Sequence, residues 1–159
     1  MVIHFFIIIM IVNINYSGQF LENTNLLKFS TWKPKQYIHK CKDYTIIIFK
    51  SGKCRIMGCK TELLISTLPF KINNIKIQSL TISESLGETV NLYKLAVKLD
   101  RDAMYEPELF PALRLLKFNP LCVNIFASGK IIILGIKTID CDDIISNIIK
   151  TISDYISVI

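Results

Sequence analysis

The chain has 159 residues, 51% of them apolar, which suits one compact domain or two small halves that share one sheet. Its formal net charge of +6 is uneven, because residues 1–80 carry 11 Lys and Arg against 3 Asp and Glu, whereas residues 81–159 carry 8 against 10. The basic half favours a polyanion such as nucleic acid, and the acidic half favours a basic partner; ordinary surface solvation is the open alternative.

Two residue types exclude whole classes of protein. The five cysteines are odd in number and include no CxxC pair, so they indicate neither a disulfide framework nor a zinc site. We expect reduced structural thiols in an intracellular protein. The chain has only two histidines, and no cluster of Asp, Glu and His has catalytic spacing. We therefore expect no enzyme and no cofactor.

The chain opens with an apolar run at Phe5–Val12, far shorter than the ~20 residues that span a membrane as a helix. Its β-branched residues favour a buried strand, and its flanks do not fit a signal peptide, so we expect no membrane association. A short helix or turn is expected over 18–29. Strands are expected over 36–42 and 45–49, and residues 61–70 leave room for about two helical turns.

In the second half, alternation predicts a strand over 74–83, and helical spacing predicts a helix over 90–99. A loop is expected over 104–111 and a strand over 113–118. The C-terminal helix has Asp140 as its expected N-cap and a stripe of isoleucines as its apolar face.

One motif occurs twice, 77 residues apart: TIIIFKSGKCRIMGCKT at 45–61 and CVNIFASGKIIILGIKT at 122–138 share nine of seventeen residues. Each copy has two apolar runs around a Ser-Gly-Lys turn, which predicts a hairpin. The duplication predicts two like halves, which we place at 1–72 and 73–159. Because each half has few helices, we expect helices on one face of the sheet and a bare, binding face on the other.

The stretch YEPELFPALRLLKFNP at 105–120, followed by NIFASGKIIILGIKT, closely resembles the second repeat of the TATA-box-binding protein (TBP) family. Residues 45–61 match the same hairpin of the family's first repeat, and IKIQSLTIS at 75–83 resembles the strand that opens the second. The resemblance implies an α+β, TBP-like saddle. In it, two pseudo-two-fold repeats form one curved antiparallel sheet of ten strands, with helices on the convex side and the DNA minor groove on the concave side.

The same resemblance assigns Phe110 and Phe126 to the family's wedging pair in the second repeat, and Phe49 to one of the pair in the first. The sequence leaves Trp32 and Tyr37 open as the fourth wedge. Such rings insert between base steps and kink the duplex, and TBP is itself the standard example. Ordinary core aromatics are the alternative interpretation.

Further DNA contacts follow from strand alternation and from the family match. Alternation places seven more residues on the face of the wedges: Arg55, Met57, Ser79, Thr81, Asn124, Ile132 and Leu134. Four lysines match family lysines near the DNA backbone: Lys53, Lys60, Lys130 and Lys137. Such lysines neutralise phosphates and make binding salt-dependent, although solvated turn lysines are the alternative.

Departures from the family pattern weaken the expected TATA preference. Ser79 replaces a hydrogen-bonding Asn, and Met57 and Leu134 replace threonines of the two hairpins. The first-repeat counterpart of Ser79 is expected in the apolar region Ile7–Ile9. The first repeat is also short between Gly58 and Ser79, so its long helix is expected to be nearly absent.

Glu106 and Glu108 match the loop with which the family docks transcription factor IIB. The sequence therefore predicts a TBP-like initiation factor that binds and bends promoter DNA and recruits a factor IIB-like protein and the RNA polymerase machinery. The alternative is a saddle-shaped interaction module of a transcription complex that has lost DNA binding. The shortened first repeat favours an origin of the protein in a large DNA virus. A viral protein would act in the viral factory in the cytoplasm, and a cellular protein would act in the nucleus.

Overall fold

The computed structural model describes residues 10–22, 27–31, 35–63 and 65–157. Its strands are β1 (Met10–Phe20), β2 (Gln36–Lys40), β3 (Thr45–Phe49), β4 (Lys53–Cys59), β5 (Ile72–Ser85), β6 (Ala103–Met104), β7 (Ala112–Leu115), β8 (Cys122–Phe126) and β9 (Lys130–Ile136). The helices are α1 (Leu92–Leu99) and α2 (Asp142–Ile156), with short 3-10 turns η2 (Ile65–Thr67) and η3 (Asp100–Asp102). None of the helices in this part of the chain is long and apolar enough to cross a membrane.

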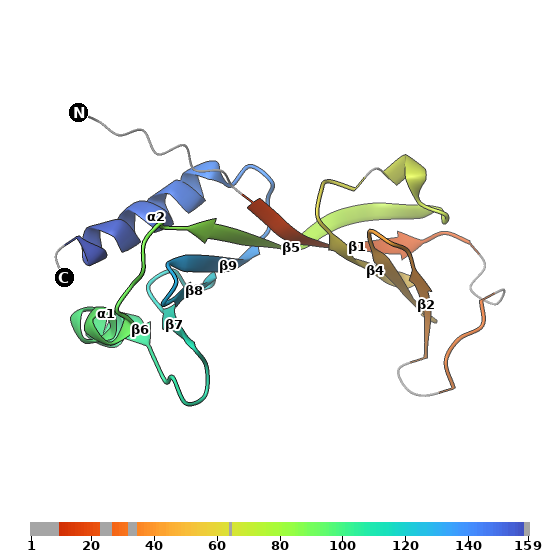
Figure 1. Cartoon of the computed structure of the whole chain (residues 1–159). Coiled ribbons are helices and arrows are strands. Elements are labelled where there is room, and N and C mark those ends of the chain that lie inside the picture. The colour runs from red at the N-terminus through yellow and green to blue at the C-terminus, as the bar shows by residue number, and fades with distance from the viewer. Residues whose placement is uncertain (1–9, 23–26, 32–34, 64, 158–159) are drawn as a thin grey trace. The chain divides into compact units, whose positions relative to one another are not determined.

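The described residues divide into two compact units, and β5 runs from one into the other (Figure 1). The N-terminal unit comprises residues 11–80, and the C-terminal unit comprises Met10 and residues 81–157. The hydrogen-bonded strand order is β2-β3-β4-β1-β5-β9-β8-β7-β6. The described residues thus form nine strands, where the family resemblance implied ten.

In the C-terminal unit, both helices contribute an apolar stripe to one core. The stripes have helical spacing and consist of Leu92, Leu95 and Leu99 on α1 and Ile145, Ile148 and Ile152 on α2. The sheet contributes the alternate residues of its hairpin, which are fully buried: Val123, Ile125, Ile131 and Ile133. Helix α1 also contacts α2, β6 and β7. Removal of this much apolar surface from water is the main stabilising term of the unit.

The ends of the helices follow capping rules, with one correction. Asn91 caps α1, and its side-chain oxygen accepts a hydrogen bond from the Lys94 amide at 3.0 Å. Helix α2 begins one residue later than expected, with Cys141 at its N-cap position and no side-chain hydrogen bond there, so the predicted Asp140 cap is wrong. Asp142 and Asp143 lie in the first turn of α2, where they complement the helix dipole.

The N-terminal unit buries its sheet without a long helix in the described residues. Of the described residues between β4 and β5, only those of the turn η2 are helical, which confirms the expected loss of a long helix there. Aromatic rings cover part of the sheet of this unit instead. Phe70 makes edge contacts with Phe20, Tyr37 and His39 at centroid distances of 5.3–6.1 Å. The helix or turn expected over 18–29 is wrong at its start, because residues 18–20 lie in β1; residues 23–26 lie outside the described residues.

Both predicted hairpins are confirmed, and a glycine at the same position of the repeat makes each turn. Gly52 and Gly129 have φ angles of 80° and 81°, and their amides donate to the carbonyls of Phe49 and Phe126 at 2.8 and 2.9 Å. A Cβ on Gly129 would lie 1.9 Å from the carbonyl oxygen of Glu88. Only glycine therefore fits this turn.

Candidate nucleic-acid interface

In the C-terminal unit, strand pairing brings the predicted DNA-contacting residues of β8 and β9 together. Asn124 pairs with Ile132, and Cys122 pairs with Leu134. Paired residues of antiparallel strands share a face, and alternate residues along a strand do too, so Phe126 lies on the same face as these four. We call this surface the phenylalanine face of the C-terminal unit. The helices contribute to the core on the opposite face.

Two phenylalanines meet on this surface. The rings of Phe110 and Phe126 lie 6.1 Å apart between centroids, at an interplanar angle of 67°. Phe110 is 42% exposed, and Phe126 is half-buried. Adjacent apolar rings that remain partly exposed form a surface that a partner can bury. The predicted pair is therefore close in space and accessible.

The N-terminal unit carries an equivalent surface, its phenylalanine face. Ile47 pairs with Arg55, and Thr45 pairs with Met57, so alternation places Phe49 beside them. The alternate residues Ile46, Ile48 and Ile56 are fully buried on the other side. The expected face of Phe49, Arg55 and Met57 is thus assembled by the pairing of the strands.

The structure decides against Tyr37 as the second wedge of this unit. Tyr37 pairs with Ile48, whose side chain lies on the side opposite Phe49. Its ring instead makes an edge contact with Phe70 at 6.1 Å. Trp32, the other candidate, lies outside the described residues.

The expected apolar counterpart of Ser79 is wrong. Phe20 and Leu86 donate their amides to the carbonyls of the two turn glycines, Gly52 and Gly129, at 2.8 and 3.0 Å. Because those glycines occupy the same place in the repeat, β1 and β5 correspond with an offset of 66 residues, the separation of Phe20 and Leu86. Ser79 therefore corresponds to Asn13, and Thr81 to Asn15. The region Ile7–Ile9 itself lies outside the described residues.

These polar residues form hydrogen bonds in the N-terminal unit. Asn15 Nδ2 donates to Ser79 Oγ at 3.1 Å, and Asn13 Oδ1 accepts from the Gly58 amide at 3.1 Å. All three side chains are half-buried. Neither asparagine was predicted, although the apolar Ile14 and Tyr16 alternate with them in the sequence, and both are buried.

One further residue was missed in the C-terminal unit. Arg114 pairs with Asn124, so it lies on the phenylalanine face, and it is exposed. Its Nε atom is 3.5 Å from Asn124 Oδ1. Its neighbours Leu113 and Leu115 are buried, and this alternation is the pattern in the sequence that could have identified it.

The four predicted lysines are all exposed. Lys53 and Lys130 begin the second strand of their hairpins, β4 and β9, while Lys60 and Lys137 directly follow those strands. Each hairpin therefore carries one cation near either end of its second strand. Exposed cations at such positions are available to phosphates.

The loop 105–111, which we call the acidic loop, joins β6 to β7. The Glu106 carbonyl accepts hydrogen bonds from the amides of Leu109 and Phe110, both at 2.9 Å, which fixes a turn. Glu106 and Glu108 are exposed, and Leu109 is 81% exposed. Tyr105 anchors the start of the loop through an edge contact with Tyr93 at 5.2 Å. The loop thus presents two carboxylates and the apolar side chain of Leu109 to solvent, in addition to Phe110 on the phenylalanine face.

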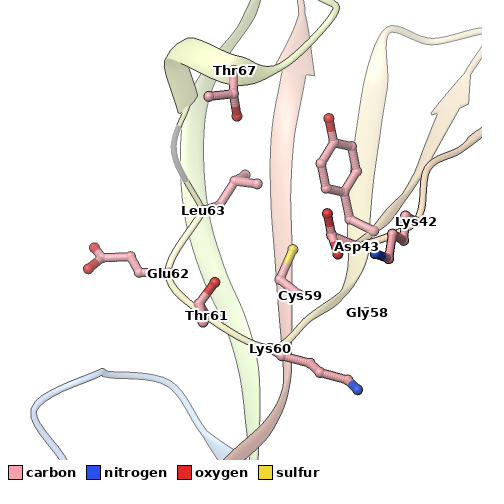
Figure 2. A pocket seen from close by; sticks show the side chains of 10 residues that line it. Lys42, Asp43, Gly58, Cys59, Lys60, Thr61, Glu62, Leu63 and Thr67 are labelled. Carbon is pink, nitrogen blue, oxygen red and sulfur yellow. The ribbon is translucent and has the colours of Figure 1, made fainter.

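The N-terminal unit also has a hollow of about 490 Å³ (Figure 2). Buried Cys59 lines it, together with Lys42, Lys60, Asp43 and Glu62. Cations and carboxylates alternate there, which does not favour a polyanion. Among the described residues, no three potential metal ligands lie close enough together to hold an ion.

The comparisons with known proteins agree with this geometry. The family described as transcription factor TFIID (or TATA-binding protein, TBP) matches residues 74–155. The TATA-box-binding protein of Archaeoglobus fulgidus is 31% identical, over 82% of this chain and 86% of that protein. That of Sulfolobus acidocaldarius is 37% identical, over 69% of this chain and 61% of that protein. That of Sulfurisphaera tokodaii is 39% identical, over 58% of this chain and 54% of that protein. The last two matches thus span less than two thirds of the relatives.

The fold agrees as well. The solved structure of Methanococcus jannaschii TBP aligns with a TM-score of 0.71 and 28% identity, over 92% of this chain and 98% of that one. The predicted α+β fold class is confirmed by this match and by the single antiparallel strand order. The chain belongs to the family of the TATA-box-binding protein, transcription factor TFIID.

Proposed function

We propose that the chain is a transcription initiation factor that binds double-stranded promoter DNA in the minor groove and bends it. The observation that carries this proposal is the exposed contact of Phe110 and Phe126 on the phenylalanine face of the C-terminal unit. Apolar rings of this kind open a base step when they insert, and the bent duplex then contacts more protein surface. Phe49 has the same place in the N-terminal unit, and the named relatives are TATA-box-binding proteins.

The polar groups near the middle of β1 and β5 support an A·T preference. The minor groove of A·T pairs presents only acceptors, and the G·C pair adds a donor. Asn13, Asn15 and Ser79 supply amide and hydroxyl donors on these strands. Met57 and Leu134, in contrast, supply no donor. We infer that discrimination rests mainly on the ease with which A·T-rich steps deform, with fewer hydrogen bonds than the family pattern provides.

The acidic loop provides the second half of the proposed function, the recruitment of a factor IIB-like protein. Its carboxylates repel phosphates, so they suit a basic protein surface, and Leu109 adds an apolar contact at 81% exposure. The turn held by the Glu106 carbonyl keeps these groups in place before binding. A preformed loop loses less conformational entropy on association.

A second function is favoured by one observation. Met57 and Leu134 make the phenylalanine faces more apolar, which also suits a protein partner in a chain that has lost DNA binding. The two functions differ in their response to salt, since phosphate contacts release counterions and apolar contacts do not.

The test is a titration of the full chain against A·T-rich, G·C-rich and random duplexes at several salt concentrations. We expect tightest binding to the A·T-rich duplex and an affinity that falls linearly with the logarithm of the salt concentration. Absence of binding to all three duplexes would leave the protein-interaction function as the conclusion.

A further inference from the structure

A row of three residues crosses the phenylalanine face of the C-terminal unit. Arg114 on β7 pairs with Asn124 on β8, and Asn124 pairs with Ile132 on β9. The next row contains Ala112 and Phe126, and Phe110 lies against Phe126. Arg114 is therefore two residues along its strand from the row that holds the wedge, about 7 Å away.

Asn124 restricts the arginine. Only 6% of Asn124 is exposed, and its Oδ1 atom is 3.5 Å from Arg114 Nε and 3.7 Å from Cys122 Sγ. The contact uses the inner nitrogen of the guanidinium group, which leaves the terminal amino groups for another acceptor. Arg114 itself is exposed. Asn124 therefore orients the guanidinium group of Arg114, and the terminal amino groups stay available to another acceptor.

The N-terminal unit has no arginine at the corresponding place. Ile47 corresponds to Asn124 in the repeat, and Ile47 pairs with Ile38, which is 44% exposed. The single arginine of that unit's row, Arg55, instead corresponds to Ile132. Each row of paired residues thus contains one arginine. In the C-terminal unit this is Arg114 on the first strand of the row, β7, and in the N-terminal unit it is Arg55 on the last strand, β4.

We propose that Arg114, positioned by Asn124, is a specificity-determining residue that reads the A·T-rich minor groove beside the phenylalanine wedge. This rests on the proposed function. A guanidinium group donates to the adenine N3 and thymine O2 acceptors, whereas in a G·C pair the guanine amino group is another donor and opposes it. Because Ile38 stands at this place in the other unit, the contact also fixes which way round the chain binds an asymmetric site.

The test uses an asymmetric duplex with an A·T-rich half and a G·C-rich half. Arg114→Met keeps the side-chain stem and removes the charge, and Arg114→Lys keeps the charge and removes the planar fork. Arg101→Met is the matched control, because Arg101 is exposed in η3 outside the phenylalanine face. An iron-chelate cleavage reagent, attached to exposed Cys41 at limiting concentration, marks the DNA half beside the N-terminal unit.

We expect Arg114→Met to lower the preference for A·T-rich over G·C-rich duplex roughly tenfold and to give cleavage in both halves, while the control keeps one orientation. Arg114→Lys should retain the salt dependence but lose most of the preference. Unchanged preference and orientation in Arg114→Met would overturn the assignment while leaving the proposed function in place. If the unmodified chain binds no duplex, the proposed function fails first.

Discussion

Removal of the wedge should abolish DNA bending and leave the fold intact. The change is the double variant Phe110→Ala and Phe126→Ala. Full burial of a phenylalanine stabilises by about 1.5–3 kcal/mol, and Phe110 has 42% of its surface left to bury on DNA, which corresponds to about 1 kcal/mol. Half-buried Phe126 adds a similar amount at most. The two rings together should therefore contribute about 2 kcal/mol to affinity, or about 30-fold in Kd.

The cost to the fold should be tolerable. Truncation of a fully buried phenylalanine to alanine destabilises by about 3–5 kcal/mol. Neither ring is fully buried, so each truncation should cost about half of that or less, which gives about 3–5 kcal/mol at most for the double variant. The edge contact between the rings, which is lost too, is worth about 0.5–1.5 kcal/mol. Thermal unfolding of the variant checks this before any DNA is added.

Energy transfer between dyes at the two ends of an A·T-rich duplex measures the bend. We expect the unmodified chain to increase the energy transfer between the dyes. With the double variant at saturating protein, we expect no increase. Val97→Ala is the control, because Val97 is 83% exposed on α1 and away from the phenylalanine face. A folded double variant that bends the duplex as before would refute the wedge.

Three further changes test other parts of the structure. Glu106→Lys with Glu108→Lys should weaken a factor IIB-like partner by about 2–4 kcal/mol at most and leave duplex affinity equal or slightly raised, as measured by pull-down and by DNA titration. Glu84→Gln should raise the Tm at pH 7, because burial raises the pKa of the Glu84 carboxyl and its unbonded Oε1 atom penalises the charged form. Iodoacetamide should alkylate exposed Cys41 first, since burial raises the pKa of Cys59; peptide masses after timed reaction show the order.

Each of these has a clear contrary outcome. Loss of DNA binding in the charge-reversed loop, with partner binding intact, would show that the acidic loop faces the duplex. For Glu84, the folded state holds its proton more tightly than the unfolded state, so the stability of the unmodified chain should fall as pH rises above the usual pKa of 4.5. Equal pH dependence in Glu84→Gln would contradict this. Alkylation of Cys59 before Cys41 would show that β4 opens readily.

The repeat made most of the second half predictable. The Ser-Gly-Lys turns fixed both hairpins, and strand alternation then placed Phe126, Asn124 and Ile132 on one face, as the register shows. Elements defined by a left-handed glycine and by period-two burial are local features, so they can be read from the residues alone.

The first half was harder, for a physical reason. The position of β1 in the repeat depends on its pairing with β4 and β5, which are distant in the sequence, so the family match placed the counterpart of Ser79 in the wrong region. Asn13 and Asn15 were missed as a consequence. Tyr37 stayed open because the spacing of the wedge pair favours Trp32, whereas the segment KPKQY resembles the family motif; only the pairing of Tyr37 with Ile48 decides its face.

The central claim is that the chain reads the minor groove. Replacement of A·T by inosine·cytosine pairs tests it, because inosine lacks the guanine amino group and so presents an A·T-like minor groove beneath a G·C-like major groove. A competition titration should compare an A·T-rich duplex, its inosine·cytosine counterpart and its G·C counterpart. We predict that the inosine·cytosine duplex competes almost as well as the A·T duplex, and the G·C duplex poorly. An inosine·cytosine duplex that competes no better than the G·C duplex would contradict the account.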